Sequence, residues 1–271
     1  MSAFFETHCH LHLLKRPLDS VVQQCKEVGV NSILTVTVDE SSLDSAIAIS
    51  CKYDSVICSQ GIHPLEVSLI GQSTFNKIVS NIQKNPDKVV AIGEVGLDFF
   101  PPEHPPPEQL QVALFEQQLQ IALDFDIPVI IHTRFAEEAL IHCLNNFPNI
   151  RGVIHSFQSS TSLAKYAVSK GLYIGFNGLI TRNSRNHFTR ILESIPLELI
   201  LLETDSPWHT PNGFRGQENS PSFLPIIVES AARLLKLPID SLSTTLVSNA
   251  TTLFLQRQHP YPHKNICNTP L

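Results

Sequence analysis

An acidic residue that follows an apolar run is the first feature of this sequence that suggests chemistry. Residues 89–92 are uninterrupted Val, Ala and Ile, and Glu94 follows them between Gly93 and Gly96. Such a run is typical of a parallel strand covered on both faces, and the glycines allow the backbone to turn closely around the acid. We interpret Glu94 as the centre of a metal site; the competing interpretation is a helix cap or the partner of an arginine.

Two histidines separated by one residue lie in the first predicted strand, residues 4–10. At this spacing the side chains of His8 and His10 point to the same side of a strand, as two ligands of one metal must. His12 continues the alternation, and we interpret it as a bystander.

Other polar residues follow short apolar segments in the same way. His63, His132 and His155 each come at or just after the end of such a segment. Arg134 is two residues beyond His132, and Asp205 follows the apolar segment nearest the C-terminus. If these segments are parallel strands, all of the side chains lie at carboxyl ends.

Strand and helix patterns alternate along the chain. Strands are predicted over 4–10, 31–38, 55–61, 88–94, 127–132, 152–155, 172–177 and 199–203, and helices over 17–28, 42–52, 75–83, 108–124, 135–146, 163–170, 186–193, 224–236 and 239–254. This order predicts an α/β protein that is a single (β/α)8 TIM barrel, in which the carboxyl ends of the strands meet at one mouth. No GxGxxG follows the first strand, which disfavours an open nucleotide-binding sheet.

The composition agrees with one large domain. The chain has 271 residues, of which 42% are hydrophobic, so we expect one domain over 1–256 and a loosely held tail over 257–271. The net charge of −6 argues against tight binding of nucleic acid by charge alone, although a small basic patch beside a metal could hold phosphate. The six cysteines are scattered and contain no CxxC pair. With no segment long and apolar enough for a membrane span, we expect a soluble, cytoplasmic monomer without an obligate protein partner.

A barrel would gather four imidazoles and two carboxylates at its mouth, which is too many for one tetrahedral ion. We therefore predict two divalent ions. One is held by His8, His10 and Asp205, the other by His132 and His155, and Glu94 bridges them. Nitrogen and oxygen donors together admit Zn²⁺, Mn²⁺ or Fe²⁺, whereas Mg²⁺ prefers more oxygen and water ligands.

Two neighbouring divalent ions imply hydrolysis by an activated water. Asp205 is the candidate to orient or deprotonate that water, which makes Asp205 and Glu94 the predicted catalytic residues. His63 and Arg134 are candidates to bind an anionic oxygen of the substrate. The alternative roles are a loop hydrogen bond for His63 and a surface salt bridge for Arg134.

Taken in order, these motifs make the sequence similar to the TatD family over residues 4–255. The similarity is carried by His8-Cys9-His10, Gly61-Ile62-His63-Pro64, Gly93-Glu94-Val95-Gly96-Leu97-Asp98, His132, His155 and Glu203-Thr204-Asp205-Ser206-Pro207. The resemblance implies a metal-dependent hydrolase with an amidohydrolase-like barrel, and family members act largely as deoxyribonucleases, several of them trimming DNA from the 3′ end. It also implies the same six ligands, and it places His63 and Arg134 where members bind phosphate.

Three residues depart from the pattern of that family. Glu6 stands where an aspartate commonly precedes the two histidines, Glu218 replaces a common basic residue, and Ser220 replaces the usual glutamate. None is a predicted ligand. An acid at position 218 does not help to hold a polyphosphate chain, so these changes bear on substrate binding.

Three functions are compatible with this set of residues. The first is a two-metal deoxyribonuclease that hydrolyses phosphodiesters with DNA as its substrate. The second is an ester or amide hydrolase, such as an aminoacyl-tRNA deacylase or a small-molecule amidohydrolase, that uses the same water. The third is a metal-binding protein without catalysis, and the presence of every predicted ligand speaks against it.

Overall fold

Eight parallel strands form one sheet in which spatial order follows chain order. The protein is represented by a computed structural model that describes residues 3–100, 106–182 and 187–256. The strands are β1 (Phe4–Cys9), β2 (Val30–Thr35), β3 (Val56–Gln60), β4 (Val89–Asp98), β5 (Val129–Arg134), β6 (Gly152–Ile154), β7 (Tyr173–Phe176) and β8 (Ile200–Leu202).

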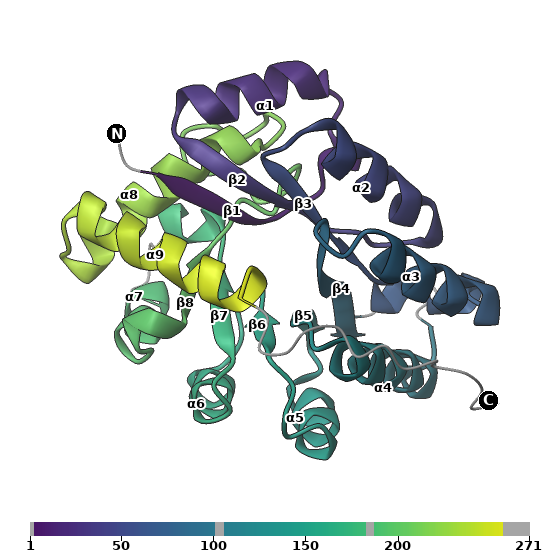
Figure 1. Ribbon diagram of the computed structural model, residues 1–271. Helices are drawn as coiled ribbons and strands as arrows, with labels where there is room; N and C mark the ends of the chain where they lie inside the picture. The colour runs from purple at the N-terminus through teal and green to yellow at the C-terminus, as the bar shows by residue number, and fades with distance from the viewer. Residues whose placement is uncertain (1–2, 101–105, 183–186, 257–271) are drawn as a thin grey trace.

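The last strand returns to the first. The Asp205 N–H donates to the carbonyl of His8 over 2.9 Å, and Thr7 Oγ1 donates to the carbonyl of Leu202 over 3.1 Å. These bonds bring β8 beside β1, so the sheet forms a nearly closed barrel (Figure 1). The predicted (β/α)8 fold is confirmed.

Helices follow the strands and surround the sheet (Figure 1). They are α1 (Leu18–Glu27), α2 (Glu40–Lys52), α3 (Gln72–Lys84), α4 (Glu108–Phe125), α5 (Glu137–Asn146), α6 (Thr161–Ser169), α7 (His187–Glu193), α8 (Leu224–Leu235) and α9 (Ile239–Phe254). Short 3-10 turns also occur, at Leu11–Leu13, Pro64–Leu69, Gly178–Arg182, Leu197–Leu199 and Pro221–Phe223. The sequence patterns did not predict these turns, because elements of three to six residues are too short to show a periodicity.

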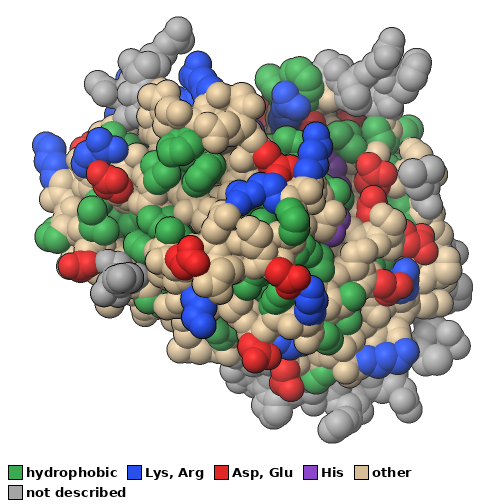
Figure 2. Space-filling view, turned by 90° about the horizontal axis from the view of Figure 1, so that it is seen from above, with side chains coloured by type: hydrophobic (Ala, Val, Ile, Leu, Met, Phe, Trp, Pro, Cys, Tyr) green, Lys and Arg blue, Asp and Glu red, His purple; other side chains and the backbone are tan. Residues whose placement is uncertain are grey.

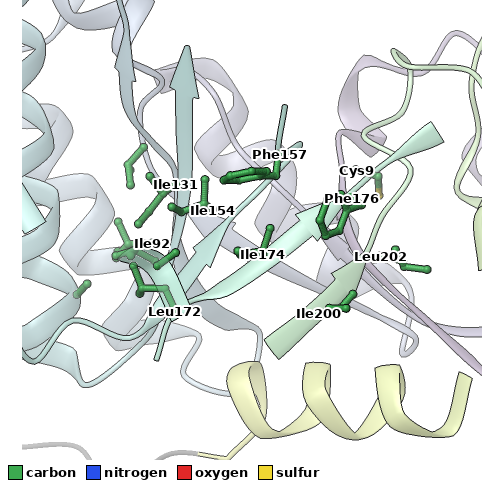
Figure 3. Packing of buried hydrophobic residues seen from close by; sticks show 14 of the residues in the cluster. Cys9, Ile92, Ile131, Ile154, Phe157, Leu172, Ile174, Phe176, Ile200 and Leu202 are labelled. Atoms are coloured by element: carbon green, nitrogen blue, oxygen red, sulfur yellow. The ribbon is translucent and has the colours of Figure 1, made fainter. Parts of the chain in front are cut away.

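Alternation along the strands produces two separate buried clusters. In β5, Val129 and Ile131 belong to the outer cluster, which packs between sheet and helices, while Ile130 belongs to an inner cluster. Figure 3 shows the outer cluster, with Ile131 and Ile154 beside one another on adjacent strands. Both faces of the sheet are therefore apolar, which explains why the strands read as continuous hydrophobic runs.

The inner cluster is completed by the last helix. It comprises Phe5, Leu34, Val36, Val90, Ala91, Ile130, Val153, Leu201, Ala250, Leu253 and Phe254, of which the last three come from α9. The rings of Phe5 and Phe254 have centroids 6.3 Å apart. Because these strand residues precede the polar strand ends, α9 closes the end of the barrel opposite the mouth.

The largest error in a predicted boundary concerns the fourth strand. The fourth strand does not end at Glu94 but continues as β4 to Asp98, and every residue of it is buried. Its pairing with β5 extends to Asp98 opposite Arg134. The glycines that suggested a turn instead permit close packing: a Cβ on Gly96, which has φ of 138°, would lie 2.0 Å from the carbonyl oxygen of His132.

Other features of the chain agree with the composition. Cys9, Cys25, Cys51, Cys58 and Cys143 are free thiols, and Cys267 lies outside the described residues. The predicted tail over 257–271 also lies outside them. Within the described ranges, no helix is both long enough and apolar enough to cross a bilayer.

Candidate metal centre

Histidines occupy the inward-facing positions where β5 and β6 end. Ile130 belongs to the inner cluster, and His132 is two residues further along the same strand. Val153 and His155 have the same relation. Because side chains alternate between the faces of a strand, both histidines point into the mouth of the barrel.

Glu94 presents one carboxylate oxygen to each of two histidine pairs. Its Oε1 lies 2.8 Å from His132 Nδ1 and 2.7 Å from His155 Nε2. Its Oε2 lies 3.5 Å from His8 Nε2 and 3.6 Å from His10 Nε2. Each pair forms, with Glu94, a cluster whose atoms could hold one metal ion. The carboxylate thus lies between the two histidine pairs, with one oxygen directed to each.

The first histidine pair converges on one point. The Nε2 atoms of His8 and His10 are 3.1 Å apart, and both rings are buried. His10 Nδ1 donates to the carbonyl of Val36 over 2.9 Å, so Nε2 of the neutral ring carries a lone pair. Lone pairs on two imidazole nitrogens at this separation repel each other unless a proton or a cation lies between them. The pair of nitrogens therefore fits a metal ion.

Asp205 faces the same point from the end of β8. Its Oδ1 lies 3.7 Å from His8 Nε2 and 3.6 Å from His10 Nε2. Its other oxygen, Oδ2, lies 3.4 Å from Nε2 of His209. The structure thus brings together all six residues that the strand ends suggested: His8, His10, Glu94, His132, His155 and Asp205.

The second histidine pair is oriented by two further carboxylates. Asp98 Oδ2 accepts a hydrogen bond from His132 Nε2 over 3.1 Å, so Nδ1, which lies on the side of Glu94, is the nitrogen that could bind a metal. Glu203 Oε1 lies 3.4 Å from His155 Nδ1 and also accepts the Ser156 N–H over 2.6 Å. Carboxylates behind ligand histidines fix the ring orientation and increase basicity.

The electrostatics of the cluster favour ionised carboxylates. Burial by itself raises the pKa of Glu94, but the charge of His155 and hydrogen bonds from His132 hold this pKa well below its usual range. Burial likewise raises the pKa of Asp205, and the imidazoles of His10 and His8 lower it to about 2. In contrast, burial lowers the pKa of His155 but the charge of Glu94 raises it well above normal. Negative charge is therefore concentrated where a dication would replace bound protons.

The mouth opens into a cavity of about 610 Å³. Its lining includes four residues other than glycine with positive φ: Phe135 (54°), Ser156 (49°), Asp205 (55°) and His209 (53°). Left-handed backbone in such residues costs on the order of 1 kcal/mol or more each and collects at functional sites. The strain concentrates on the loops that carry the polar side chains.

His63 contributes a donor to the mouth. Its Nδ1 accepts the N–H of Leu65 over 3.2 Å, so the neutral ring carries its proton on Nε2. That Nε2 lies 3.7 Å from Glu94 Oε1. Burial lowers the pKa of His63 to about 3, which keeps the ring neutral. The loop hydrogen bond expected as an alternative is thus present, and it directs the free N–H toward the site.

Arg134 lies at the cavity wall. Its Cζ is 3.6 Å from the centroid of the Phe100 ring, a cation–π contact. Among the described residues, no carboxylate lies within ion-pair distance of its guanidinium, so the surface salt bridge considered as an alternative is not formed. In the part of the chain that the structure describes, no ion pair occupies the hydrogen-bonding edge of this guanidinium.

The sequence profile of the family described as TatD related DNase matches residues 5–255, which include every strand of the barrel except the first residue of β1. The chain belongs to the TatD family. The resemblance carried by the strand-end motifs is confirmed.

Individual TatD relatives are similar over nearly their whole lengths. The uncharacterized metal-dependent hydrolase YjjV of Escherichia coli (strain K12) is 30% identical over 254 residues, which are 93% of this chain and 97% of that protein. The crystal structure of YjjV has a TM-score of 0.86 and 29% identity and covers 93% of this chain and 98% of its own. The 3′-5′ ssDNA/RNA exonuclease TatD of Erwinia amylovora is 32% identical over 244 residues, 87% of this chain and 93% of that one.

In this TatD chain, sequence reasoning missed three residues of the site. Asp98 and Glu203 were only parts of motifs, and His209 was not considered. Asp98 is four residues after Glu94, a spacing that puts both side chains on one face of a strand. That signal was lost because the strand was predicted to end at Glu94. Glu203 ends the predicted strand 199–203, so the strand-end signal was present for it and was not used; for His209 we find no local signal, since its partner is defined by the fold.

The three departures from the TatD pattern lie outside the cavity lining. Glu6 is buried and accepts the N–H groups of His8 (2.9 Å) and Thr204 (3.0 Å), which ties β1 to the end of β8. Glu218 Oε1 accepts the Lys15 N–H over 3.0 Å, and the Ser220 hydroxyl caps the turn Pro221–Phe223. In this TatD barrel all three side chains therefore form hydrogen bonds within the protein.

Proposed function

We propose that this chain is a two-metal phosphodiesterase that shortens single-stranded DNA from its 3′ end. The observation that carries the proposal is the split of the Glu94 carboxylate, with Oε1 facing His132 and His155 and Oε2 facing the other pair. A carboxylate in this position can bridge two cations. The DNA substrate and the polarity are supported by the name of the Erwinia relative, a 3′-5′ ssDNA/RNA exonuclease.

In this proposal the six predicted ligands divide as the two clusters do. His8, His10 and Asp205 would hold one ion, His132 and His155 would hold the other, and Glu94 would supply one oxygen to each. When bound, two divalent ions lower the pKa of a water and offset charge on the entering and leaving oxygens of a phosphodiester. Mg²⁺, Mn²⁺ and Zn²⁺ are the candidates; the imidazole nitrogens favour Mn²⁺ or Zn²⁺, and Mg²⁺ would need additional oxygen or water ligands.

The remaining steps belong to side chains of the chain itself. Asp205 orients the attacking water and takes its proton at a carboxylate oxygen; Oδ2, which lies 3.4 Å from His209 Nε2, is placed for this because Oδ1 is the oxygen that faces His8 and His10. The His63 Nε2–H and the Arg134 guanidinium bind the non-bridging oxygens of the scissile phosphate. Asp98 and Glu203 hold the rings of His132 and His155 in their ligand orientations.

The test uses metal-free protein, single-stranded oligonucleotides labelled at the 3′ or 5′ end, and Mg²⁺, Mn²⁺ or Zn²⁺ added back. Shortening that needs metal and releases the 3′ label first is the expected result. Protein shown to bind two metal equivalents that leaves every oligonucleotide intact contradicts the proposal. Turnover of carboxylic esters or amides by that same protein then identifies the ester or amide hydrolase considered above.

The setting of the protein is also a proposal. The free cysteines agree with a reducing compartment, and we propose a cytoplasmic monomer. Light scattering coupled to gel filtration tests the monomer directly: a mass near 30.2 kDa is expected, and a multiple of it contradicts the prediction.

A further inference from the structure

Exposed aromatic side chains collect at the mouth of the barrel. The described residues contain three large aromatic side chains that are exposed: Phe100 (39%), Phe135 (76%) and Trp208 (50%). Phe100 and Phe135 follow the ends of β4 and β5, and Trp208 follows β8. All three therefore lie at the end of the barrel that carries the candidate ligands. Phe135 and Trp208 line the cavity together with His132, His155 and Asp205.

Neither side-chain burial nor the backbone conformation favours a phenylalanine at position 135. Its side chain is the most exposed of these aromatic groups, so burial contributes little to keeping it there. Its φ of 54° is a left-handed conformation that favours glycine or asparagine and is strained for a bulky residue. The chain keeps an unburied ring at a strained position, and such positions collect at binding sites.

Phe135 is coupled to the arginine that precedes it. Its ring centroid lies 5.4 Å from that of Phe100 with an interplanar angle of 36°, and Arg134 Cζ lies 3.6 Å from the Phe100 centroid. Phe100 thus contacts both neighbours and holds the guanidinium in place. The Arg134 guanidinium is suited to bind a phosphate and the Phe135 ring is suited to stack on a base. The two residues are consecutive in the chain, and a phosphate and a base are likewise close together in a nucleotide.

Because the surface carries little net positive charge, an exposed aromatic ring matters more for binding nucleic acid than it would on a basic surface. The net charge is −6, and acidic and basic side chains are interspersed on the face shown in Figure 2. A nucleic acid strand gains little from an overall field of this kind. Stacking of bases on aromatic rings does not depend on the electrostatic field of the surface. Removal of one stacking residue weakens nucleic acid binding roughly 5- to 150-fold.

We propose that Phe135 is the floor of a nucleobase subsite, on which a base of single-stranded DNA stacks while Arg134 holds the adjoining phosphate. Trp208 forms the other aromatic wall of the same cavity. The subsite deepens the proposed function and rests on it, because it names the structural element of the substrate that the mouth recognises. Duplex DNA, whose bases are already stacked, does not fit it.

The test compares wild-type protein with Phe135→Ala and Phe135→Trp. Two oligonucleotides are used, a dT8 and the same strand with tetrahydrofuran abasic units at its three 3′-terminal positions. Binding is measured by fluorescence anisotropy on metal-free protein, and KM and kcat are measured on metal-loaded protein. Because Phe135 is largely exposed, neither variant is expected to unfold. Leu110→Ala, at an exposed apolar position on α4, is the matched control.

Phe135→Ala is expected to weaken dT8 binding and raise KM by roughly 5- to 150-fold, with kcat nearly unchanged. Phe135→Trp restores wild-type values, and the abasic strand binds equally to all variants. Equal dT8 binding by wild type and Phe135→Ala overturns the subsite. A loss of affinity of Phe135→Ala for the abasic strand as large as that for dT8 overturns it as well. Binding of dT8 that depends on Phe135 without cleavage refutes only the proposed hydrolysis. Wild-type protein that neither binds nor cleaves dT8 refutes both proposals.

Discussion

Asp98 accepts a hydrogen bond from the Nε2 of His132 over a distance of 3.1 Å, and this bond leaves Nδ1, which lies 2.8 Å from Glu94 Oε1, as the nitrogen that could bind a metal. Burial raises the pKa of Asp98, but the hydrogen bond and charge of His132 lower it below the usual range. An ionised Asp98 is therefore the partner that decides which ring nitrogen can bind a metal.

Asp98→Asn should weaken metal binding by about 10- to 100-fold, because the amide can donate to Nε2 and so move the His132 proton to Nδ1. Metal affinity is measured by competition with a fluorescent chelator. Asp54→Asn, an exposed acid between α2 and β3, is the matched control and should bind metal as wild type does. Unchanged affinity in Asp98→Asn would show that the tautomer does not depend on this bond.

Glu94→Gln should remove the thermal stabilisation that metal provides. A cation at about 100 times its Kd stabilises the folded state by about 2.7 kcal/mol, so a chelator should lower the wild-type Tm by several degrees. The variant should keep the barrel, since Gln has the same shape, but show almost no change with chelator. Circular dichroism melts of both proteins measure the difference. A variant that is unfolded without heating would mean that Glu94 is needed for the fold itself.

Asp205→Asn should lower kcat by about 10²- to 10⁴-fold, because the amide cannot take a proton from the attacking water. One oxygen remains to face His8 and His10, so part of the metal affinity should persist. Metal content is determined by atomic emission on the same samples used for kinetics. If kcat falls only in proportion to lost metal, Asp205 is a ligand and not the proton acceptor.

Glu6→Gln should flatten the pH dependence of stability of the metal-free protein. Burial raises the pKa of Glu6 to about 8 from 4.5, although N–H bonds from His8 and Thr204 oppose this. Between these values the folded state holds a proton that the unfolded state has lost, so stability falls as pH rises from 4.5 to 8. The slope is on the order of 1 kcal/mol per pH unit. The Tm values of wild type and Glu6→Gln, measured by calorimetry, should converge at low pH, and the variant should be increasingly the more stable toward pH 8. Parallel curves of Tm against pH would show that the N–H bonds to Glu6 outweigh the effect of burial on its pKa.

Gly96→Ala should destabilise the protein by about 3 kcal/mol or more, because it combines a left-handed φ with a clash against the backbone of β5. The added Cβ would lie 2.0 Å from the His132 carbonyl oxygen. Gly71→Ala is the matched control: its Cβ meets only Ser73 Oγ at 3.9 Å, and we expect a loss of about 1 kcal/mol or less at this N-cap position. Similar Tm values for the two variants would contradict the packing argument.

The sequence by itself determined the barrel and the six candidate ligands. Alternation within a strand is a property of covalent geometry, so His8 and His10 were known to share a face, and His132 was known to lie at a strand end. Continuous apolar runs followed by polar residues then implied parallel strands with one common mouth. Such inferences need only neighbours in sequence, and they were therefore available before any contact was known.

The tertiary structure alone decided how these residues pair. That Glu94 directs one oxygen to each histidine pair follows from the register between β4 and β5 and from the return of β8 to β1. The contact of Asp98 with His132 and that of Phe135 with Phe100 depend on the β4–β5 register, and the contact of Glu203 with His155 depends on the pairing of β6, β7 and β8. Strand register and barrel closure arise from packing between segments far apart in the chain. A shift of one residue in register would turn each side chain of a strand to the other face. No local sequence pattern therefore predicts the register or the closure.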